Sequence, residues 1–428
     1  MTAPLPWLAP FRDSPFEGQV LVPGSKSLTN RVLILAALAD GPSVLTRPLG
    51  SRDTNLMLAA LTALGATIER DGTTWTVTPS AWDRTEATEV DCGLAGTVMR
   101  FVPAVAAIGR APVTFDGDEH ARVRPMGTTI ATLRDLGVEI DDGGRGALPF
   151  TVHGAGQVVG GQLEIDASAS SQFVSALLLA GSHFDKGLEL RHVGTALPSM
   201  PHVDMTVAEL RRRGVHVETD GPNSWYVHPG PIGALDVEIE PDLSNAGVFI
   251  AAALVTGGSV RIRNWPEKTD QAGDAWRTIA PAFGGTADRD GADLVFRAGA
   301  TLNGVELDLH DVGELTPVIA AIAALSGGPS SLTGIAHLRG HETDRLKAIV
   351  TEVNRLGGDA EELADGLLIR PRPLRGGTFH TYDDHRMAHA GVVLGLRVPE
   401  LFVENVVTTV KTYPNFAPVW ERLMMKNT

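Results

Sequence analysis

Five positively charged side chains stand where a positive charge needs an explanation. Lys26, Arg31, Arg100 and Arg386 lie in or beside the expected first turn of an apolar helix, and Arg345 stands at the head of an amphipathic one. The helix dipole already makes that end positive, so each cation costs about 0.3 kcal/mol or more unless an anion joins it. Taken singly, each could be a solvated surface charge. Together they predict helix N-termini that converge on phosphate or carboxylate groups.

Polar residues at the same helix starts add hydrogen-bond donors. Residues 168–172 read SASSQ, whose hydroxyl and amide groups suit a polyhydroxylated, phosphorylated ligand. Residues 24–27 read GSKS but lack the G-x-x-x-x-G-K-[ST] spacing, which argues against a P-loop nucleotidase. The simpler explanation for these polar residues is N-capping, which needs no ligand. N-capping accounts for Ser244 and Asn245, but it does not account for the five cations.

Composition excludes several classes of function. The 428 residues carry a formal net charge of −15, which argues against a nucleic-acid surface. Cys92 is the single cysteine, so no intramolecular disulfide or thiolate metal cluster can form, and no metal-ligand spacing occurs. We interpret His310, His337 and His389 as structural. The apolar runs are too short to span a bilayer and the N-terminal residues do not resemble a secretory signal, so we expect a cytoplasmic protein that binds no membrane.

The elements that must position these side chains form a repeat. A Leu-rich helix end, a glycine, a short alternating strand and Asp-Gly recur around glycines 70 to 77 residues apart, namely Gly65, Gly137, Gly214, Gly284 and Gly357. A glycine after a helix is the usual left-handed C-cap. A second phrase, a polar cluster followed by an apolar helix, occurs six times, from residues 25, 94, 168, 244, 313 and 383. Each repeat therefore contains one buried and one amphipathic helix with strands between them, which predicts an α/β fold.

Seven motifs resemble the enolpyruvyl transferase family. They are LVPGSKSLTNR at 21–31, AGTVMR at 95–100, RPMG at 124–127, SSQF at 170–173, HETDRL at 341–346, DDHRMA at 383–388 and KTYPNF at 411–416. The resemblance implies two inverted α/β domains, each built of three repeated β-α-β-α-β-β units, with the active site in the interdomain cleft. It implies a shikimate 3-phosphate-binding domain at 25–242, a second domain formed by 1–24 and 243–428, and crossovers near residues 24 and 242. The Gly/Pro-rich passage 220–242 separates the third and fourth apolar helices, which agrees with that boundary.

The activity implied by the resemblance is transfer of the enolpyruvyl group of phosphoenolpyruvate to the 5-hydroxyl of shikimate 3-phosphate. Phosphate is released after a tetrahedral intermediate, in the shikimate pathway of aromatic amino acid biosynthesis. This chemistry needs an acid for the methylene carbon, a base for the hydroxyl, and cations over phosphate and carboxylate. It implies no metal or redox cofactor, and we expect a monomer that closes around its two substrates.

The resemblance also assigns roles to individual residues. The implied catalytic groups are Glu314, facing the hydroxyl, Glu342, at the methylene carbon, and Lys26. The implied ligands of shikimate 3-phosphate are Lys26, Ser27, Arg31, Ser170, Ser171, Gln172 and Ser199. Those of phosphoenolpyruvate are Gly96, Arg124, Arg345, Arg386 and Lys411, with Lys26 and Gln172 touching both substrates. Thr97, Arg100, His341 and Glu314 complete the expected substrate contacts.

Several positions depart from the family pattern. Leu94 replaces an asparagine, Phe101 a common proline, and Glu314 stands where many members have aspartate. His341 occupies the place of a frequent lysine, and His337 that of a frequent asparagine. Histidine titrates near neutrality, whereas lysine stays charged. We therefore expect a rate that falls more steeply with rising pH than in a lysine-bearing member.

Two alternatives remain open. The family member that acts on UDP-N-acetylglucosamine has G-A-K-N where this chain has GSKS, and a reactive cysteine in a loop that here reads GDEHARVRP, at 117–125, with none. A non-catalytic ligand-binding relative would be expected to have lost some of the chemical groups. All five of the main ones are present: Lys26, Glu314, Glu342, Arg386 and Lys411.

Overall fold

The computed structural model describes residues 6–425 and divides them into two compact units. Unit 1 contains residues 6–23 and 240–425, and unit 2 contains residues 24–239. The ends of the second predicted domain, residues 1–5 and 426–428, lie outside the described residues. Each unit buries its own hydrophobic core. The chain passes from one unit to the other after Pro23 and returns after Ile239.

Unit 2 consists of three copies of the β-α-β-α-β-β arrangement that the repeat and the resemblance predict. The middle copy contains β6 (Thr88–Asp91), α3 (Gly96–Ala106), β7 (Pro112–Asp116), α4 (Glu119–Arg122), α5 (Gly127–Asp135), β8 (Glu139–Asp141) and β9 (Phe150–His153). Strands β6 and β7, which precede and follow α3 in the sequence, pair in parallel. Strand β9 pairs antiparallel with both β7 and β8. The resulting order, β6-β7-β9-β8, is the pattern of the other four-stranded sheets.

The other copies of unit 2 follow the same plan. The first contains α1 (Lys26–Ala37), β3 (Ser43–Thr46), α2 (Arg52–Ala63), β4 (Thr67–Asp71) and β5 (Thr74–Thr78). The third contains β10 (Gly161–Ile165), α6 (Gln172–Gly181), β11 (Leu188–His192), α7 (Met200–Arg212), β12 (Val217–Thr219) and β13 (Ser224–Val227).

Unit 1 repeats the plan. Its first copy contains β2 (Glu17–Val20), α8 (Leu243–Thr256), β15 (Ser259–Ile262), α9 (Trp276–Ala282), β16 (Thr286–Asp290) and β17 (Asp293–Arg297). Its second contains β18 (Glu306–Asp308), α10 (Thr316–Ala324), β19 (Ser330–Thr333), α11 (Arg345–Arg355), β20 (Asp359–Leu363) and β21 (Gly366–Arg370). The last contains β22 (Gly377–Phe379), α12 (His385–Gly395), β23 (Leu401–Val403) and α13 (Phe416–Met424), and β1 (Trp7–Leu8) pairs with β23 where a hairpin strand would stand.

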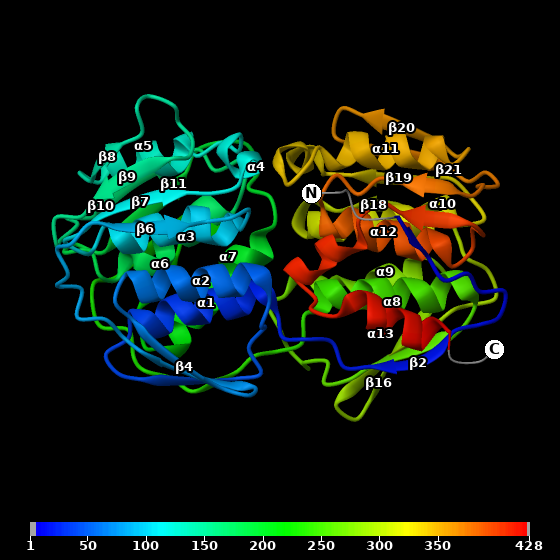
Figure 1. Cartoon of the computed structure of the whole chain (residues 1–428), viewed down its shortest axis with the longest axis horizontal. Coiled ribbons are helices and arrows are strands. Elements are labelled where there is room, and N and C mark those ends of the chain that lie inside the picture. The colour runs from blue at the N-terminus through cyan, green and yellow to red at the C-terminus, as the bar shows by residue number, and fades with distance from the viewer. Residues whose placement is uncertain (1–5, 426–428) are drawn as a thin grey trace. The chain divides into compact units, whose positions relative to one another are not determined.

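The first strand of each unit comes from a distant part of the chain. Strand β2 pairs in parallel with β15, so the N-terminal segment, blue in Figure 1, completes a sheet of unit 1. Strand β14 (Val237–Glu238) pairs in parallel with β3 and completes the first sheet of unit 2. Each unit is therefore finished by a strand about 190 to 240 residues away along the chain from its partner.

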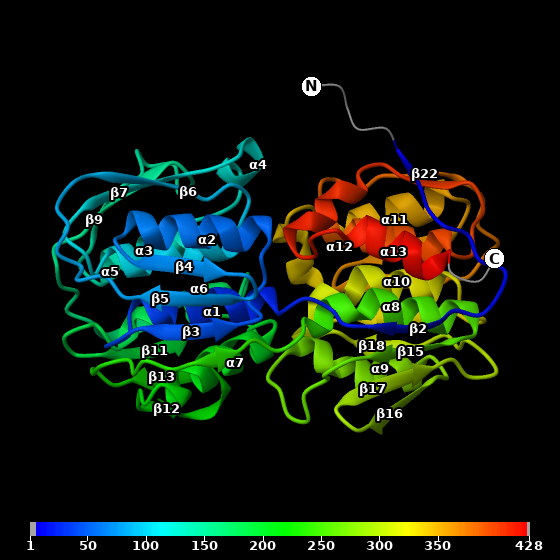
Figure 2. The same ribbon diagram turned by 60° about the horizontal axis from the view of Figure 1, so that its bottom comes forward.

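Three buried helices form the centre of each unit. Helices α1, α3 and α6 contact one another in unit 2, as α8, α10 and α12 do in unit 1, where Figure 2 shows α8, α10 and α12 side by side. Each packs against a sheet of its own repeat, so most of its surface is covered, which explains why these helices are largely apolar beyond their first turns. Among residues 6–425, no helix has the length and apolar character needed to cross a membrane.

The five repeated glycines end the outer helices. Gly65, Gly137, Gly214, Gly284 and Gly357 have φ between 81° and 107°. This is the left-handed region, which a side chain other than glycine's enters at a cost. The prediction of glycine C-caps is confirmed.

Capping at the buried helices differs in part from the prediction. Ser25 accepts a hydrogen bond from Leu28 N at the start of α1, and Asp384 accepts one from Arg386 N at the start of α12. The prediction that Ser244 and Asn245 are caps is wrong, because Asp242 caps α8 and both residues lie in its first turn. At α3, α6 and α10, the N-cap residue makes no side-chain capping bond within the described part of the chain.

Candidate active site

The N-terminus of α3 is the centre of the candidate site in unit 2. Gly96 opens this helix, and a Cβ added there would lie 3.2 Å from both Arg124 Nη2 and Gln172 Oε1. A side chain at position 96 would therefore fill the space between these two groups. Glycine keeps it open, next to helix N–H groups that have no side-chain cap. A helix N-terminus flanked by a guanidinium group is suited to bind an anion.

Arg100 orients the polar residues at the start of α6. Its Nη1 donates to Ser170 Oγ at 3.1 Å and to Gln172 Oε1 at 3.0 Å, and its guanidinium carbon lies 4.8 Å from the centre of the Phe173 ring. Arg100 is the fifth residue of α3, so it lies in the second turn and not in the first. Ser171 is buried beside this group, at the N-cap of α6.

Arg124 is held by the backbone. Its Nη1 donates to Leu94 O at 3.3 Å. Leu94 replaces the asparagine of the family pattern, but the group that binds Arg124 is a main-chain carbonyl, which any residue supplies. The departure at position 94 therefore leaves this contact of Arg124 intact.

Lys26 and Arg31 occupy different environments on α1. Lys26 is the first residue of the helix, and its Nζ lies 3.4 Å from a carboxylate oxygen of Asp53, which is almost fully buried. Arg31 lies in the second turn, and the centre of the Phe101 ring is 5.3 Å from its guanidinium carbon. That contact gives Phe101 a packing role that the family's proline could not fill.

Arg31 is almost completely buried, with 2% of its surface exposed. Four of its N–H groups donate to neutral oxygens, those of Ser27 O, Ser175 Oγ, His202 O and Thr206 Oγ1. Burial lowers the pKa of Arg31 to about 9, and the negative charge of Glu209 only partly opposes this effect. Arg31 is thus a buried positive charge whose direct partners are neutral, an arrangement that an anionic ligand would stabilise.

Ser199 and Thr97 are positioned by local structure. Ser199 precedes α7 with φ 57° and ψ 46°, a left-handed conformation that costs about 1 kcal/mol or more in a residue with a side chain. Strain of this kind persists where the surrounding structure imposes it, often at ligand sites. Thr97 Oγ1 accepts a hydrogen bond from Asn30 Nδ2 at 2.7 Å, so it links α3 to α1.

Glu342 is the centre of the candidate site in unit 1. Arg345 Nη2 lies 2.8 Å from one of its carboxylate oxygens, and Lys411 Nζ lies 2.7 Å from the other. The three side chains are 3%, 12% and 7% exposed for Arg345, Glu342 and Lys411, so water screens these ion pairs little. The motifs at 341–346 and 411–416 thus meet at one carboxylate.

Asp384 is a further functional candidate, which the sequence motifs do not single out. This fully buried carboxylate accepts hydrogen bonds from Arg345 Nε at 2.8 Å and from Arg345 Nη2 at 3.3 Å, besides capping α12. Burial by itself would lower the pKa of Arg345, but the charges of Asp384, Glu342 and Glu314 outweigh burial and raise it above the usual value. Arg345 is therefore a permanent cation. The motif at 383–388 contains Asp384, yet only packing reveals its partner.

His341 accepts a hydrogen bond in this arrangement. Arg345 Nη1 lies 3.2 Å from His341 Nδ1. A guanidinium group can only donate, so Nδ1 must carry a lone pair and the ring is the neutral form with its proton on Nε2. In this state His341 is not the counterpart of a charged lysine.

The first turn of α8 also belongs to the candidate site. Ser244 Oγ donates to a carboxylate oxygen of Glu314 at 3.4 Å, and Arg386 Nη1 lies 3.5 Å from Asn245 Oδ1. Asn245 Nδ2 donates to Thr412 O at 3.0 Å, next to Lys411. The two residues expected to be caps therefore connect Glu314, Arg386 and the segment of Lys411.

Two histidines near these groups are neutral. Burial, with a smaller contribution from His310, lowers the pKa of His337 to about 4, although Glu314 acts in the opposite direction. Burial, followed by the charge of Arg386, lowers the pKa of His389 well below its usual value.

Cys92 lies buried directly after β6, where burial raises the pKa of its thiol. A protonated thiol of this kind is not a nucleophile.

The structure thus assembles two sets of predicted residues. In unit 2, Gly96, Arg100, Arg124, Ser170 and Gln172 form one contact network, while Lys26 pairs with Asp53 and Arg31 binds the backbone of Ser27. In unit 1, His341, Glu342, Arg345 and Lys411 form a second network. Glu314 is joined to it through its electrostatic effect on Arg345.

Comparisons with known proteins identify the family of this chain. A family model described as EPSP synthase (3-phosphoshikimate 1-carboxyvinyltransferase) matches residues 12–420. The 3-phosphoshikimate 1-carboxyvinyltransferase of Kocuria rhizophila is 54% identical, over 98% of this chain and 96% of that protein. EPSP synthase from Acinetobacter baumannii has the same fold, with a TM-score of 0.79 and 24% identity over 97% of both chains. The enolpyruvyl transferase NikO from Streptomyces tendae shares it too, with a TM-score of 0.77 and 20% identity over 98% of this chain and 97% of that one. The match along nearly the whole chain, with a relative more than half identical to it, makes this protein a member of the EPSP synthase family.

Proposed function

We propose that the protein transfers the enolpyruvyl group of phosphoenolpyruvate to the 5-hydroxyl of shikimate 3-phosphate and releases phosphate. This is the activity for which the 54% identical relative is named. The observation that carries the proposal is the open N-terminus of α3, where Gly96 leaves room for an anion between Arg124 and Gln172. The reaction belongs to the shikimate pathway of aromatic amino acid biosynthesis.

Phosphoenolpyruvate brings a carboxylate and a phosphate, and both need cations. Arg124 and the N–H groups at Gly96 serve this purpose in unit 2, and Arg345, Arg386 and Lys411 serve it in unit 1. Arginine suits the role because its planar fork can bind two oxygens of one anion. Arg345 has a raised pKa and stays charged under all conditions of the assay.

Shikimate 3-phosphate is the ligand of the remaining groups of unit 2, which we propose as its binding domain. The hydroxyls of Ser27, Ser170, Ser171 and Ser199 suit the ring hydroxyls and the phosphate, with Lys26 and Gln172 placed to serve both substrates. Arg31 supports this assignment, because within residues 6–425 its hydrogen-bond acceptors are all neutral oxygens. A bound anion would provide the charge that these partners do not.

Glu342 is the proposed acid for the methylene carbon. Its carboxylate shares Arg345 and Lys411 with any anion that binds there. A bound phosphate or carboxylate competes with Glu342 for these two cations. When their attraction to Glu342 weakens, its carboxylate takes up a proton more easily. Substrate binding itself would thus prepare the acid.

The reaction balances in two steps. In the addition, the 5-hydroxyl oxygen bonds to C2 of phosphoenolpyruvate, Glu314 takes the hydroxyl proton, and Glu342 gives a proton to C3, which becomes a methyl group. In the elimination, Glu342 takes a proton back from that methyl group as the C2–O bond to phosphate breaks. The proton that Glu314 took from the hydroxyl leaves with the phosphate, which is released as hydrogen phosphate, so both carboxyl groups return to their starting state. Lys26 stabilises the charge on the departing phosphate. Neither step needs a metal or a redox cofactor.

Release of inorganic phosphate tests the proposal. Phosphoenolpyruvate should give phosphate with shikimate 3-phosphate and none with UDP-N-acetylglucosamine. Lys411→Met should lower the rate at least about a hundredfold, whereas Lys347→Met, an exposed position on α11, should leave it unchanged. Phosphate release with UDP-N-acetylglucosamine alone would favour the family member that acts on that acceptor, and release with neither acceptor would favour a non-catalytic relative.

The monomeric state and the cytoplasmic location stay predictions from the sequence, which sedimentation and cell fractionation can check.

A further inference from the structure

We propose that unit 2 carries a metal-binding site for a borderline divalent ion such as Zn²⁺, formed by His216, Glu218 and His228. One ligand atom from each of these residues lies within 4.8 Å of the other two. None of the three belongs to the catalytic or substrate-binding groups assigned above. The site does not depend on the proposed transferase activity.

The β12–β13 hairpin brings the three side chains together. Val217 is paired with Val227 across the hairpin, and His228 N donates to His216 O at 3.0 Å, so the two histidines stand opposite each other. Val217 and Val227 are buried. Because side chains alternate between the faces of a strand, His216, Glu218 and His228 share the opposite, outward face. Residues directly opposite each other have Cβ atoms about 5 Å apart, close enough for a shared ion.

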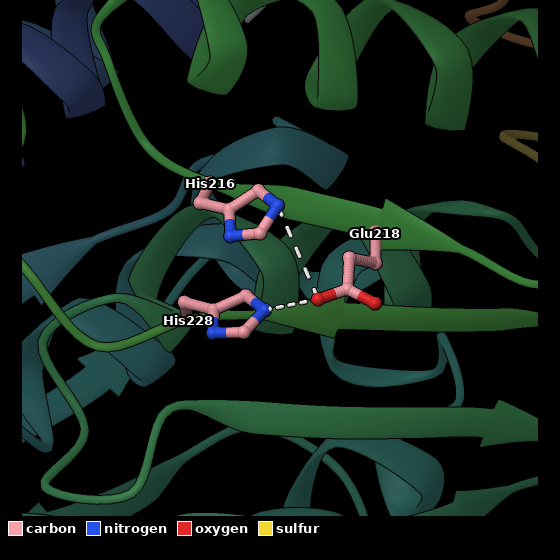
Figure 3. Close-up of side chains that lie close together, drawn as sticks. All are labelled: His216, Glu218 and His228. Atoms are coloured by element: carbon pink, nitrogen blue, oxygen red, sulfur yellow. Dashed lines mark hydrogen bonds and ion pairs between the residues drawn. The ribbon is translucent and has the colours of Figure 1, made fainter.

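The rings already point at one carboxylate oxygen. His228 Nε2 lies 2.6 Å and His216 Nε2 lies 4.0 Å from the same oxygen of Glu218, as Figure 3 shows. The two imidazoles are stacked, with centroids 4.2 Å apart and planes at 14°, and Tyr226 lies 4.0 Å from His228 on its own strand. These contacts align both Nε2 atoms before any ion binds.

The spacing fits a small tetrahedral ion. Zn²⁺ binds nitrogen and carboxylate oxygen at about 2.0–2.2 Å, which puts neighbouring ligand atoms about 3.3 Å apart in a tetrahedron. The two separations from Glu218, 2.6 and 4.0 Å, lie on either side of this value, and no two of the three ligand atoms are more than 4.8 Å apart. Side-chain rotations must therefore draw the two imidazole nitrogens and the carboxylate oxygen to similar separations. Two histidines and one carboxylate leave the fourth position open for water.

The donor set also selects the class of metal. Imidazole nitrogen suits Zn²⁺, Ni²⁺ and Cu²⁺, whereas Mg²⁺ and Ca²⁺ prefer oxygen ligands. The side chains are 68%, 59% and 30% exposed for His216, Glu218 and His228, so an ion can reach them directly from solvent. The same exposure means that replacing them should not unfold the hairpin.

Calorimetric titration of the full chain, without a polyhistidine tag and after chelator treatment, tests the site. Zn²⁺ should bind with one equivalent that both His228→Gln and Glu218→Gln weaken at least about tenfold. His153→Gln, at the end of β9 in the same unit, is the matched control and should bind like the unaltered protein. Mg²⁺ should give no binding at this site.

A second readout places the ion. Co²⁺ in place of Zn²⁺ should give visible absorption bands that are lost in His216→Gln, with phosphate release unchanged in that variant. Absence of a Zn²⁺ equivalent in the unaltered protein, or equal Zn²⁺ affinity in all variants, would overturn the proposal. A failure of the transferase assay would leave this result untouched, so the two proposals can be judged separately.

Discussion

Breaking the ion pair between Lys411 and Glu342 should destabilise the protein and inactivate it, but only the first effect should be reversible by a second substitution. The two charged atoms are 2.7 Å apart, with side chains 7% and 12% exposed. At an effective dielectric constant of about 20, their attraction is about 6 kcal/mol, most of which offsets the loss of water around the two charges. Lys411→Met removes one cation and leaves Arg345 on Glu342, so we expect a loss of about 3 kcal/mol in the free energy of unfolding.

The double variant separates stability from catalysis. Glu342→Gln removes the charge that Lys411→Met leaves poorly compensated, so the two effects should not add, and we expect a coupling free energy of about 2 kcal/mol. Urea unfolding of the four proteins in the cycle measures it. An exposed pair of the same unit, Arg297 and Asp288, is 2.8 Å apart and serves as the control, with an expected coupling of about 0.5 kcal/mol.

Phosphate release is the second assay on the same four proteins. All three variants of Lys411 and Glu342 should stay at least about a hundredfold slower than the unaltered protein, even where stability is restored. Additive effects on stability, within about 0.5 kcal/mol, would refute the ion pair as described. Recovery of activity in the double variant would refute the role of these groups in the reaction.

Three further substitutions test other parts of the site. Gly96→Ala should raise KM for phosphoenolpyruvate about tenfold (~1.4 kcal/mol), because the added Cβ would meet Arg124 and Gln172. Gly127→Ala is the control and should leave KM unchanged. Gly127 also starts a helix, but a Cβ added there would meet no described neighbour within 4 Å. His337→Asn should make the free energy of unfolding less sensitive to acid. The pKa of His337 is about 4 in the folded protein and about 6.5 in the unfolded chain. The unfolded chain therefore takes up a proton first, and His337 lowers stability as the pH drops from about 6.5 to about 4. Between pH 7.5 and pH 5, His337 should account for a loss of about 2 kcal/mol in the free energy of unfolding. Urea unfolding at the two pH values measures this loss, and an equal loss in the unaltered protein and in His337→Asn would contradict the prediction. His341→Lys should leave the pH profile of kcat unchanged, because His341 Nδ1 accepts a hydrogen bond from Arg345 and the ring therefore carries no charge to lose. A flatter decline of kcat above neutral pH in the variant would contradict this and would support the charged histidine expected from the sequence.

The repeat made most of the fold predictable. Glycines such as Gly65 and Gly284 can satisfy a left-handed φ at low cost, so their recurrence marks helix ends without any tertiary information. The apolar helices were equally legible, because a helix with no polar face must be covered on all sides. The exact caps were not predictable, since Asp242, Ser244 and Asn245 are all good capping residues and only the backbone decides among them.

The candidate residues could be named from the sequence, but the contacts among them could not. The motifs named Glu342, Arg345 and Lys411, yet nothing local to them shows that one carboxylate binds both cations. Asp53 and Asp384 were missed because their partners lie 27 and 39 residues away from them in the sequence. The metal-binding candidates of the β12–β13 hairpin were missed for a related reason. His228 lies twelve positions after His216 and ten after Glu218, and only the strand register brings it next to them.

The exchanged strands have a consequence for how the chain is made. Strand β2 leaves the ribosome early, but its partner β15 follows about 240 residues later, so β2 must wait unpaired while all of unit 2 is synthesised. Unit 2 is one continuous stretch that ends just after β14 and can complete its sheets as soon as that strand emerges. A gene fragment encoding 24–239 should therefore yield a folded product, whereas one that starts at 240 lacks a strand. That second fragment would need residues 6–23 supplied as a separate peptide, or joined to its C-terminal end through a linker.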